Sequence, residues 1–196
     1  IIGVEYIDFI GNIASISFLD VPGKVPSFIF AFINALACLF LLIVLPRIDK
    51  AKPLVIFLII VASIHMVSSL FFLFFPTKFP YVASDYSRLY MLQHVSIWFF
   101  VPIIMGLAIM PLPSSIPIKI FTMIITYMNA LVFGTIRYAV FLFILAKISM
   151  IYMAILFFVL GPLIDFVYIV GIYSLHVNRL ANKIKGDFKL WKWQYS

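Results

Sequence analysis

The chain is a series of apolar runs of roughly 20 residues, separated by short segments that carry prolines and charges. A helix of that length crosses about 30 Å of hydrocarbon, so each run is a candidate transmembrane helix. Hydrophobic residues make up 65% of the sequence and charged residues only 11%, whereas soluble domains are about 25% charged. We therefore expect an all-α, polytopic transmembrane helix bundle with five to six spanning helices and short loops.

The clearest spans are Pro26 to Pro46, Leu54 to Phe75, Leu89 to Met110, Pro117 to about Arg137, and about Met150 to Tyr173. These runs leave no room for a soluble domain of about 50 residues or more, so residues 1–196 are predicted to form a single membrane domain. The apolar residues after Arg137 are too few to span, and either continue the fourth helix or form a short separate segment. Because the chain begins with Ile1 rather than methionine, we expect that residues preceding it are missing.

The opening stretch, residues 1–19, is the most ambiguous part of the chain. Its polar residues Glu5, Asp8, Asn12 and Ser15 recur at i, i+3, i+7 and i+10. In a helix this spacing makes one narrow polar stripe on an otherwise apolar surface. The stretch is predicted to be either a sixth spanning helix or a helix lying in the membrane interface. We favour the spanning helix, which places both termini in the cytoplasm.

Basic residues are distributed unevenly between the two sides of the predicted membrane domain. Residues 47–53, 111–119 and the C-terminal segment carry three, one and five of the 14 Lys and Arg residues. The remaining five are Lys24, Lys78, Arg88, Arg137 and Lys147. Because basic loops face the cytoplasm, the positive-inside rule predicts a cytoplasmic C-terminus, with residues 179–196 as a basic tail. The net charge of +7 therefore points to a lipid bilayer rather than to nucleic acid.

Four polar residues are predicted to form a layer near the middle of the membrane. Helical rise places Asn34, His65, Asn129 and Asp165 about 12 to 18 Å from the inner ends of their helices. Such a layer suits a proton path, a cation site or the floor of a pocket for a polar ligand, with Asp165 as the ionisable member. The alternative is interhelical hydrogen bonding worth around 1 kcal/mol per contact.

Histidine and cysteine give little support to a cofactor site. His65 and His94 lie on consecutive helices, and a haem b held by this pair remains an alternative. No metal-ligand spacing is present, and His176 is expected to be a solvated or headgroup-facing side chain. Cys38 is the single cysteine, so no intramolecular disulfide can form. Arg137 is expected to extend to the lipid headgroups or to bind an acidic partner.

One family resemblance bears on the outer ends of two helices. Ser96 followed by Gly134-Thr135-Ile136-Arg137 resembles the layout of the exosortase/archaeosortase family of membrane transpeptidases. Serine stands where that family has its nucleophilic cysteine, and Gly134 stands where it has an asparagine. The resemblance implies catalysis at the outer face by Ser96 and Arg137, with His94 as a third residue.

Taken together, these features favour an accessory or anchoring subunit of a larger membrane complex, possessing no catalytic motif of its own. Other membrane protein subunits are its expected partners, and the polar layer would link it to proton or electron transfer. A small carrier or channel is the second hypothesis, and the exosortase-like transpeptidase is the third.

Overall fold

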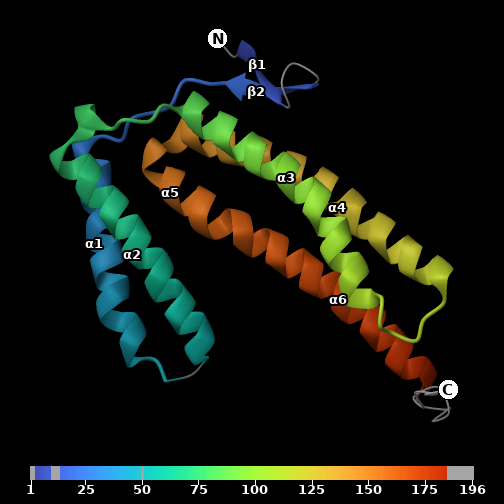
Figure 1. Ribbon diagram of the computed structural model, residues 1–196. Coiled ribbons are helices and arrows are strands. Elements are labelled where there is room, and N and C mark those ends of the chain that lie inside the picture. The colour runs from blue at the N-terminus through green and yellow to red at the C-terminus, as the bar shows by residue number, and fades with distance from the viewer. Residues whose placement is uncertain (1–2, 10–13, 50, 185–196) are drawn as a thin grey trace. The chain divides into compact units, whose positions relative to one another are not determined.

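The computed structural model describes residues 3–9, 14–49 and 51–184 (Figure 1). Its strands are β1 (Gly3–Phe9) and β2 (Ala14–Asp20). Its α-helices are α1 (Phe28–Val44), α2 (Lys52–Phe74), α3 (Ala83–Ile109), α4 (Ile116–Phe143), α5 (Met153–Ile155) and α6 (Gly161–Ile184). Short 3-10 turns cover Leu45–Arg47, Pro76–Lys78 and Met150–Tyr152, and π-helical turns cover Ile144–Ile148 and Leu156–Leu160.

Within the described residues, five helical segments are long and apolar enough to cross a membrane. They are Phe28–Arg47, Lys52–Phe74, Ala83–Ile109, Ile116–Ile148 and Met150–Lys183. The predicted all-α, multi-span fold class is confirmed. The third span begins six residues earlier than predicted, and the fourth runs past Arg137, so the apolar residues that follow Arg137 continue this helix.

The chain divides into two compact units. The first contains Ile1–Leu92 and Arg137–Pro162, and the second contains Gln93–Ile136 and Leu163–Ser196. We call them the hairpin unit and the basic unit.

In the hairpin unit, α1 and α2 pack side by side as an antiparallel pair (Figure 1). Ser27 caps the start of α1, where its hydroxyl accepts a hydrogen bond from the Phe30 N–H at 3.3 Å. The buried side of α1 consists of the small residues Ala31, Ala35 and Cys38, which recur one helical turn apart. Small residues at this spacing let two helix backbones approach closely in a membrane.

The fourth and fifth spans are separated by a break at a single residue. Ser149 is extended, with φ −173° and ψ 147°, and its hydroxyl accepts a hydrogen bond from the Ile151 N–H at 3.2 Å. Lys24 spans this break from the N-terminal segment: its N–H donates to the Leu145 carbonyl at 3.0 Å and its carbonyl accepts from Met150 at 2.8 Å. The Lys24 ammonium donates to the Lys147 carbonyl at 3.1 Å. These bonds fix the N-terminal segment against the break.

The helix predicted for residues 1–19, spanning or interfacial, is wrong in the described part of that stretch. β1 and β2 instead form an antiparallel pair whose register runs from Gly3↔Asp20 to Phe9↔Ala14. In β2 the serines alternate with Ile16 and Phe18, which is the period of a strand. The helical spacing of four polar residues masked this alternation. Gly11-Asn12, a dipeptide typical of hairpin turns, lies outside the described residues.

The strand pair is held to the helices of its own unit. Phe18 is 5% exposed, and the Leu19 N–H donates to the Tyr138 hydroxyl at 2.8 Å. An isolated two-stranded hairpin is marginally stable in water, so these contacts contribute to its stability.

Candidate functional site

Two members of the predicted midplane layer meet in the hairpin unit. His65 Nε2 on α2 lies 3.2 Å from the Asn34 Oδ1 atom on α1. Tyr152 adds a third group, because its ring stacks on the His65 imidazole with centroids 5.0 Å apart and an interplanar angle of 11°. The Tyr152 hydroxyl also donates a long hydrogen bond of 3.4 Å to Asn34 Oδ1. This cluster of three residues, the Asn34 cluster, joins three segments of the chain.

Hydrogen bonding fixes the proton position on His65. Asn34 Nδ2 donates to the Phe30 carbonyl at 2.8 Å, so Asn34 Oδ1 is an acceptor. His65 Nε2 must therefore carry the proton in its bond to Asn34. His65 Nδ1 is then a buried acceptor, and it has no hydrogen-bond partner among the described residues. The Asn34 cluster can therefore fix helices in place, and it carries one basic nitrogen. Tyr152 was missed because no sequence spacing relates it to Asn34 or His65.

Arg137 does not extend to the headgroups as predicted. Its side chain is 5% exposed, and Nη1 donates to the Gly161 carbonyl at 2.7 Å within the hairpin unit. Its guanidinium also lies over the Tyr90 ring, 5.6 Å from the centroid. A buried guanidinium is retained where carbonyl oxygens and aromatic faces replace water around it. Arg137 thus fastens the end of α4 to the start of α6.

The Tyr90 ring beneath that arginine belongs to a stack of three tyrosines. Tyr90 stacks on Tyr86 with centroids 5.6 Å apart and on Tyr138 with centroids 6.0 Å apart. The Tyr138 hydroxyl shares a 2.6 Å hydrogen bond with Ser87, in addition to accepting from β2. Tyr86 and Tyr90 are both buried, at most 3% exposed.

An apolar cavity of about 340 Å³ lies in the hairpin unit. Its walls include Phe72, Tyr86, Met153 and Phe157. This volume lies at the lower end of the range for small-molecule sites. Its lining offers thioether and aromatic groups, which suit an apolar occupant.

In the basic unit, His94 packs tightly against a neighbouring helix. The His94 ring is 2% exposed and meets Trp98 edge-on, with centroids 5.1 Å apart. A methyl group placed on Gly134 would overlap the His94 ring, so the glycine is needed for this close approach. The structure therefore gives Gly134 a packing role.

The remaining predicted site residues lie in the basic unit as well. Asn129 donates to the Ile125 carbonyl of its own helix at 2.9 Å. Asp165 on α6 is buried, and Ser96 on α3 is exposed. The pairings of Ser96 with Arg137, of His65 with His94, and of Asp165 with the Asn34 cluster join residues of different units and stay predictions.

His176 differs from its predicted role. It is 7% exposed, its Nδ1 lies 2.8 Å from the Thr122 hydroxyl, and its Nε2 lies 3.3 Å from the Ser114 hydroxyl. Thr122 and Ser114 were not singled out from the sequence, because threonine and serine in apolar helices usually bond to their own backbone, as Thr122 also does to Ile118. These bonds link α4, α6 and the connection before α4.

No described part of the chain gathers three or more His, Cys, Asp or Glu side chains that could hold a metal ion. No protein-family model, curated protein or solved structure matches this chain.

Proposed function

We propose that the protein is an integral membrane accessory or anchoring subunit of a larger complex, and that it contacts a partner through the outward face of α1. The observation that carries this proposal is the asymmetry of α1. Its buried side is the narrow stripe of small residues, whereas large apolar side chains cover the rest of its surface. Phe32 is 46% exposed and Phe40 is 65% exposed.

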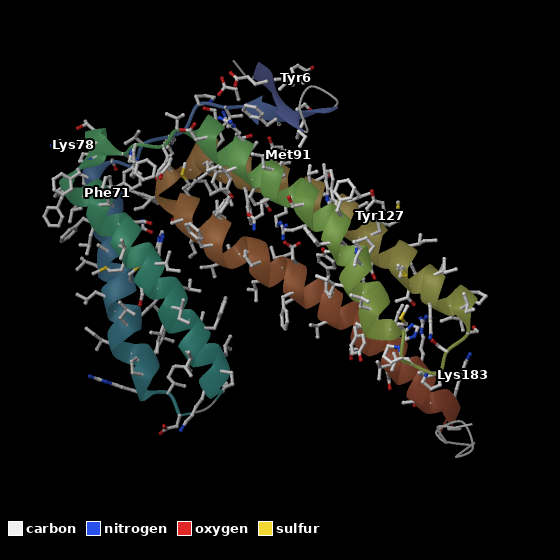
Figure 2. All side chains as sticks on the ribbon, in the orientation of Figure 1. Tyr6, Phe71, Lys78, Met91, Tyr127 and Lys183 are labelled. Atoms are coloured by element: carbon white, nitrogen blue, oxygen red, sulfur yellow. The ribbon has the colours of Figure 1, made fainter. Side chains whose placement is uncertain are left out.

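The phenylalanines on α1 support a protein contact. Phe28 and Phe32 are stacked, with ring centroids 6.4 Å apart and planes 5° apart. Rings already held in this way lose little conformational entropy on binding, and aromatic residues are enriched in protein interfaces. Figure 2 shows side chains projecting outward along both helices of the α1 and α2 pair.

The use of polar groups in the spans also favours a structural role. Ser63, Asn129 and Thr135 each donate to a carbonyl of their own helix, at 2.8 to 2.9 Å. Asn34 and His65 are bonded to one another. A carrier needs polar groups that face a water-filled path, and these side chains are engaged with backbone or with each other. A complex that moves protons would draw first on His65 and Asp165.

The C-terminus is assigned to the cytoplasm on charge. If the C-terminus is cytoplasmic, an odd number of spans, such as the five found among the described residues, implies that β1 and β2 lie on the opposite side. The test is labelling of single cysteines by a membrane-impermeant maleimide in a C38A background. T77C should react in intact cells and S115C only after permeabilisation, and the reverse pattern would invert the topology.

Photocrosslinking tests the subunit proposal. p-Benzoylphenylalanine at Phe32 or Phe40 replaces one exposed aromatic ring with another, and the same substitution at Phe72, which is 2% exposed, is the matched control. We expect discrete protein adducts in the native membrane from the first two positions and none from the third. Adducts with lipid alone, together with transport by the solitary purified protein that D165N abolishes, would overturn the proposal in favour of a carrier.

A further inference from the structure

A second cavity lies in the basic unit, between the start of α4 and the end of α6. Its volume is about 600 Å³. Apolar side chains form most of its walls, among them Ile118, Phe121, Ile125 and Leu175. Phe121 is 58% and Leu175 is 61% exposed, so these walls are open to the surroundings of the helices rather than sealed inside.

One end of this cavity is cationic. Arg179 and Lys183 line it and are exposed, and they lie four residues apart on α6, so they share one helix face. Lys183 lies in the last turn of the helix (Figure 2). Lys119 directly follows the lining residue Ile118, but its ammonium donates to the Met110 carbonyl at 2.6 Å. None of the described residues that line the cavity carries a carboxylate.

Hydrogen-bonded polar side chains lie at this end of the cavity. His176 lines the cavity and is held by Thr122 and Ser114, which also line it. Asp165 is the nearest acidic residue along the described part of α6, about 21 Å from Arg179 by helical rise. An anion at Arg179 therefore meets two cations and no opposing charge from its own helix.

The order of these groups along the helices matches an amphipathic molecule. The cations occupy the last turns of a membrane-spanning segment, the level at which lipid headgroups lie. Ile125 and Ile172 line the same cavity farther along the helices, away from this charged end. A small hydrated anion would gain nothing from those walls, whereas an acyl chain would.

We propose that this cavity binds an anionic phospholipid, with the phosphate between Arg179 and Lys183 and the first part of an acyl chain along Ile125 and Leu175. The occupant is distinct from the protein partner inferred above, and it contacts a different unit of the chain. Bound lipid would fill the space between α4 and α6 and hold the ends of both helices at the headgroup level.

Native mass spectrometry of the full chain in detergent measures this binding. Phosphatidylglycerol is titrated against phosphatidylcholine, using the wild type, R179Q/K183Q and the control R47Q/K52Q, which removes two exposed cations from the α1 and α2 connection. Loss of two cations near a lipid phosphate predicts binding of phosphatidylglycerol roughly 30-fold weaker in R179Q/K183Q. The control should bind as the wild type does, and phosphatidylcholine should bind weakly to all three.

A second variant tests the walls independently of charge. Leu175→Trp fills the apolar part of the cavity and should weaken binding of phosphatidylglycerol while both cations remain. Equal binding of the two lipids, or equal losses in R179Q/K183Q and the control, would overturn the proposal. Displacement of phosphatidylglycerol by inorganic phosphate, with no effect of Leu175→Trp, would also overturn it, because the site would then be a simple anion site.

Discussion

Replacing Gly134 by alanine tests the packing of α4 most directly. The added methyl group would overlap the ring of His94, which is 2% exposed and in edge contact with Trp98, so any shift of the ring would disturb packed neighbours. Gly171 is the matched control, because it is also a helical glycine of the basic unit, and a methyl group there meets nothing within 4 Å.

The magnitude follows from the difference between these two sites. Glycine to alanine in a helix interior contributes about 1 kcal/mol of stability, and this contribution is common to both variants. Gly171→Ala should therefore raise the free energy of unfolding by that amount. Gly134→Ala also incurs an overpacking cost of about 1–3 kcal/mol, so it should be less stable than Gly171→Ala by that cost. For a chain of this length the difference corresponds to a Tm gap of roughly 2–12 °C.

Thermal unfolding in detergent, followed by Trp98 fluorescence in a W191F/W193F background, measures the gap and reports beside His94 itself. His94→Ala should remove the penalty, so Gly134→Ala introduced into that background should no longer destabilise the protein. Equal Tm values for Gly134→Ala and Gly171→Ala would refute the close approach of His94 to α4. A penalty that persists in the His94→Ala background would refute it as well.

Substitutions at three further positions test the structure of the hairpin unit. Tyr138→Phe leaves two hydrogen-bonding groups without their hydroxyl partner and should lower the free energy of unfolding by about 1–3 kcal/mol, measured by thermal unfolding and by faster proteolysis of the N-terminal strands. Tyr152→Phe should change the free energy of unfolding by less than about 0.5 kcal/mol, because the hydrogen bond that it removes is 3.4 Å long. Tyr152→Leu should lower it by about 1 kcal/mol, because it removes the ring stack on His65, and equal losses in the two variants would contradict a larger contribution from the stack. Ala51→Gly should stabilise by about 1 kcal/mol in the same assay, because Ala51 has φ 54°, and a loss of stability would contradict the left-handed backbone there.

Much of the fold could be predicted from the sequence because length and hydropathy act on whole helices. Five apolar runs gave five spans, and prolines marked most of their ends. The two N-terminal strands were not predicted. A few polar residues can fit the spacing of a helix even where polar and apolar residues also alternate with the period of a strand. The fourth helix continues past Arg137, whose side chain is buried, and no local sequence pattern predicts that burial.

The candidate site was predicted less completely. Asn34 and His65 were assigned to one layer by counting residues along their helices, and they are hydrogen bonded. The depth of a residue along its helix does not tell which way its side chain points, because the helix can rotate about its axis. Counting residues therefore could not identify Tyr152 as a partner of Asn34, or Thr122 as a partner of His176. Rotation is decided by packing, as with the small residues of α1.

The bonds made by Lys24 have a consequence for biosynthesis. Its ammonium is paired with a carbonyl 123 residues later, and the neighbouring strand is paired with a tyrosine 119 residues later. At about 5–20 residues per second, the ribosome takes roughly 6–25 s to deliver those partners. During that interval the nascent N-terminal segment lacks its hydrogen-bond partners Tyr138 and Lys147. It makes these contacts only after Tyr138 and Lys147 have been synthesised, and until then it is open to chaperones and proteases.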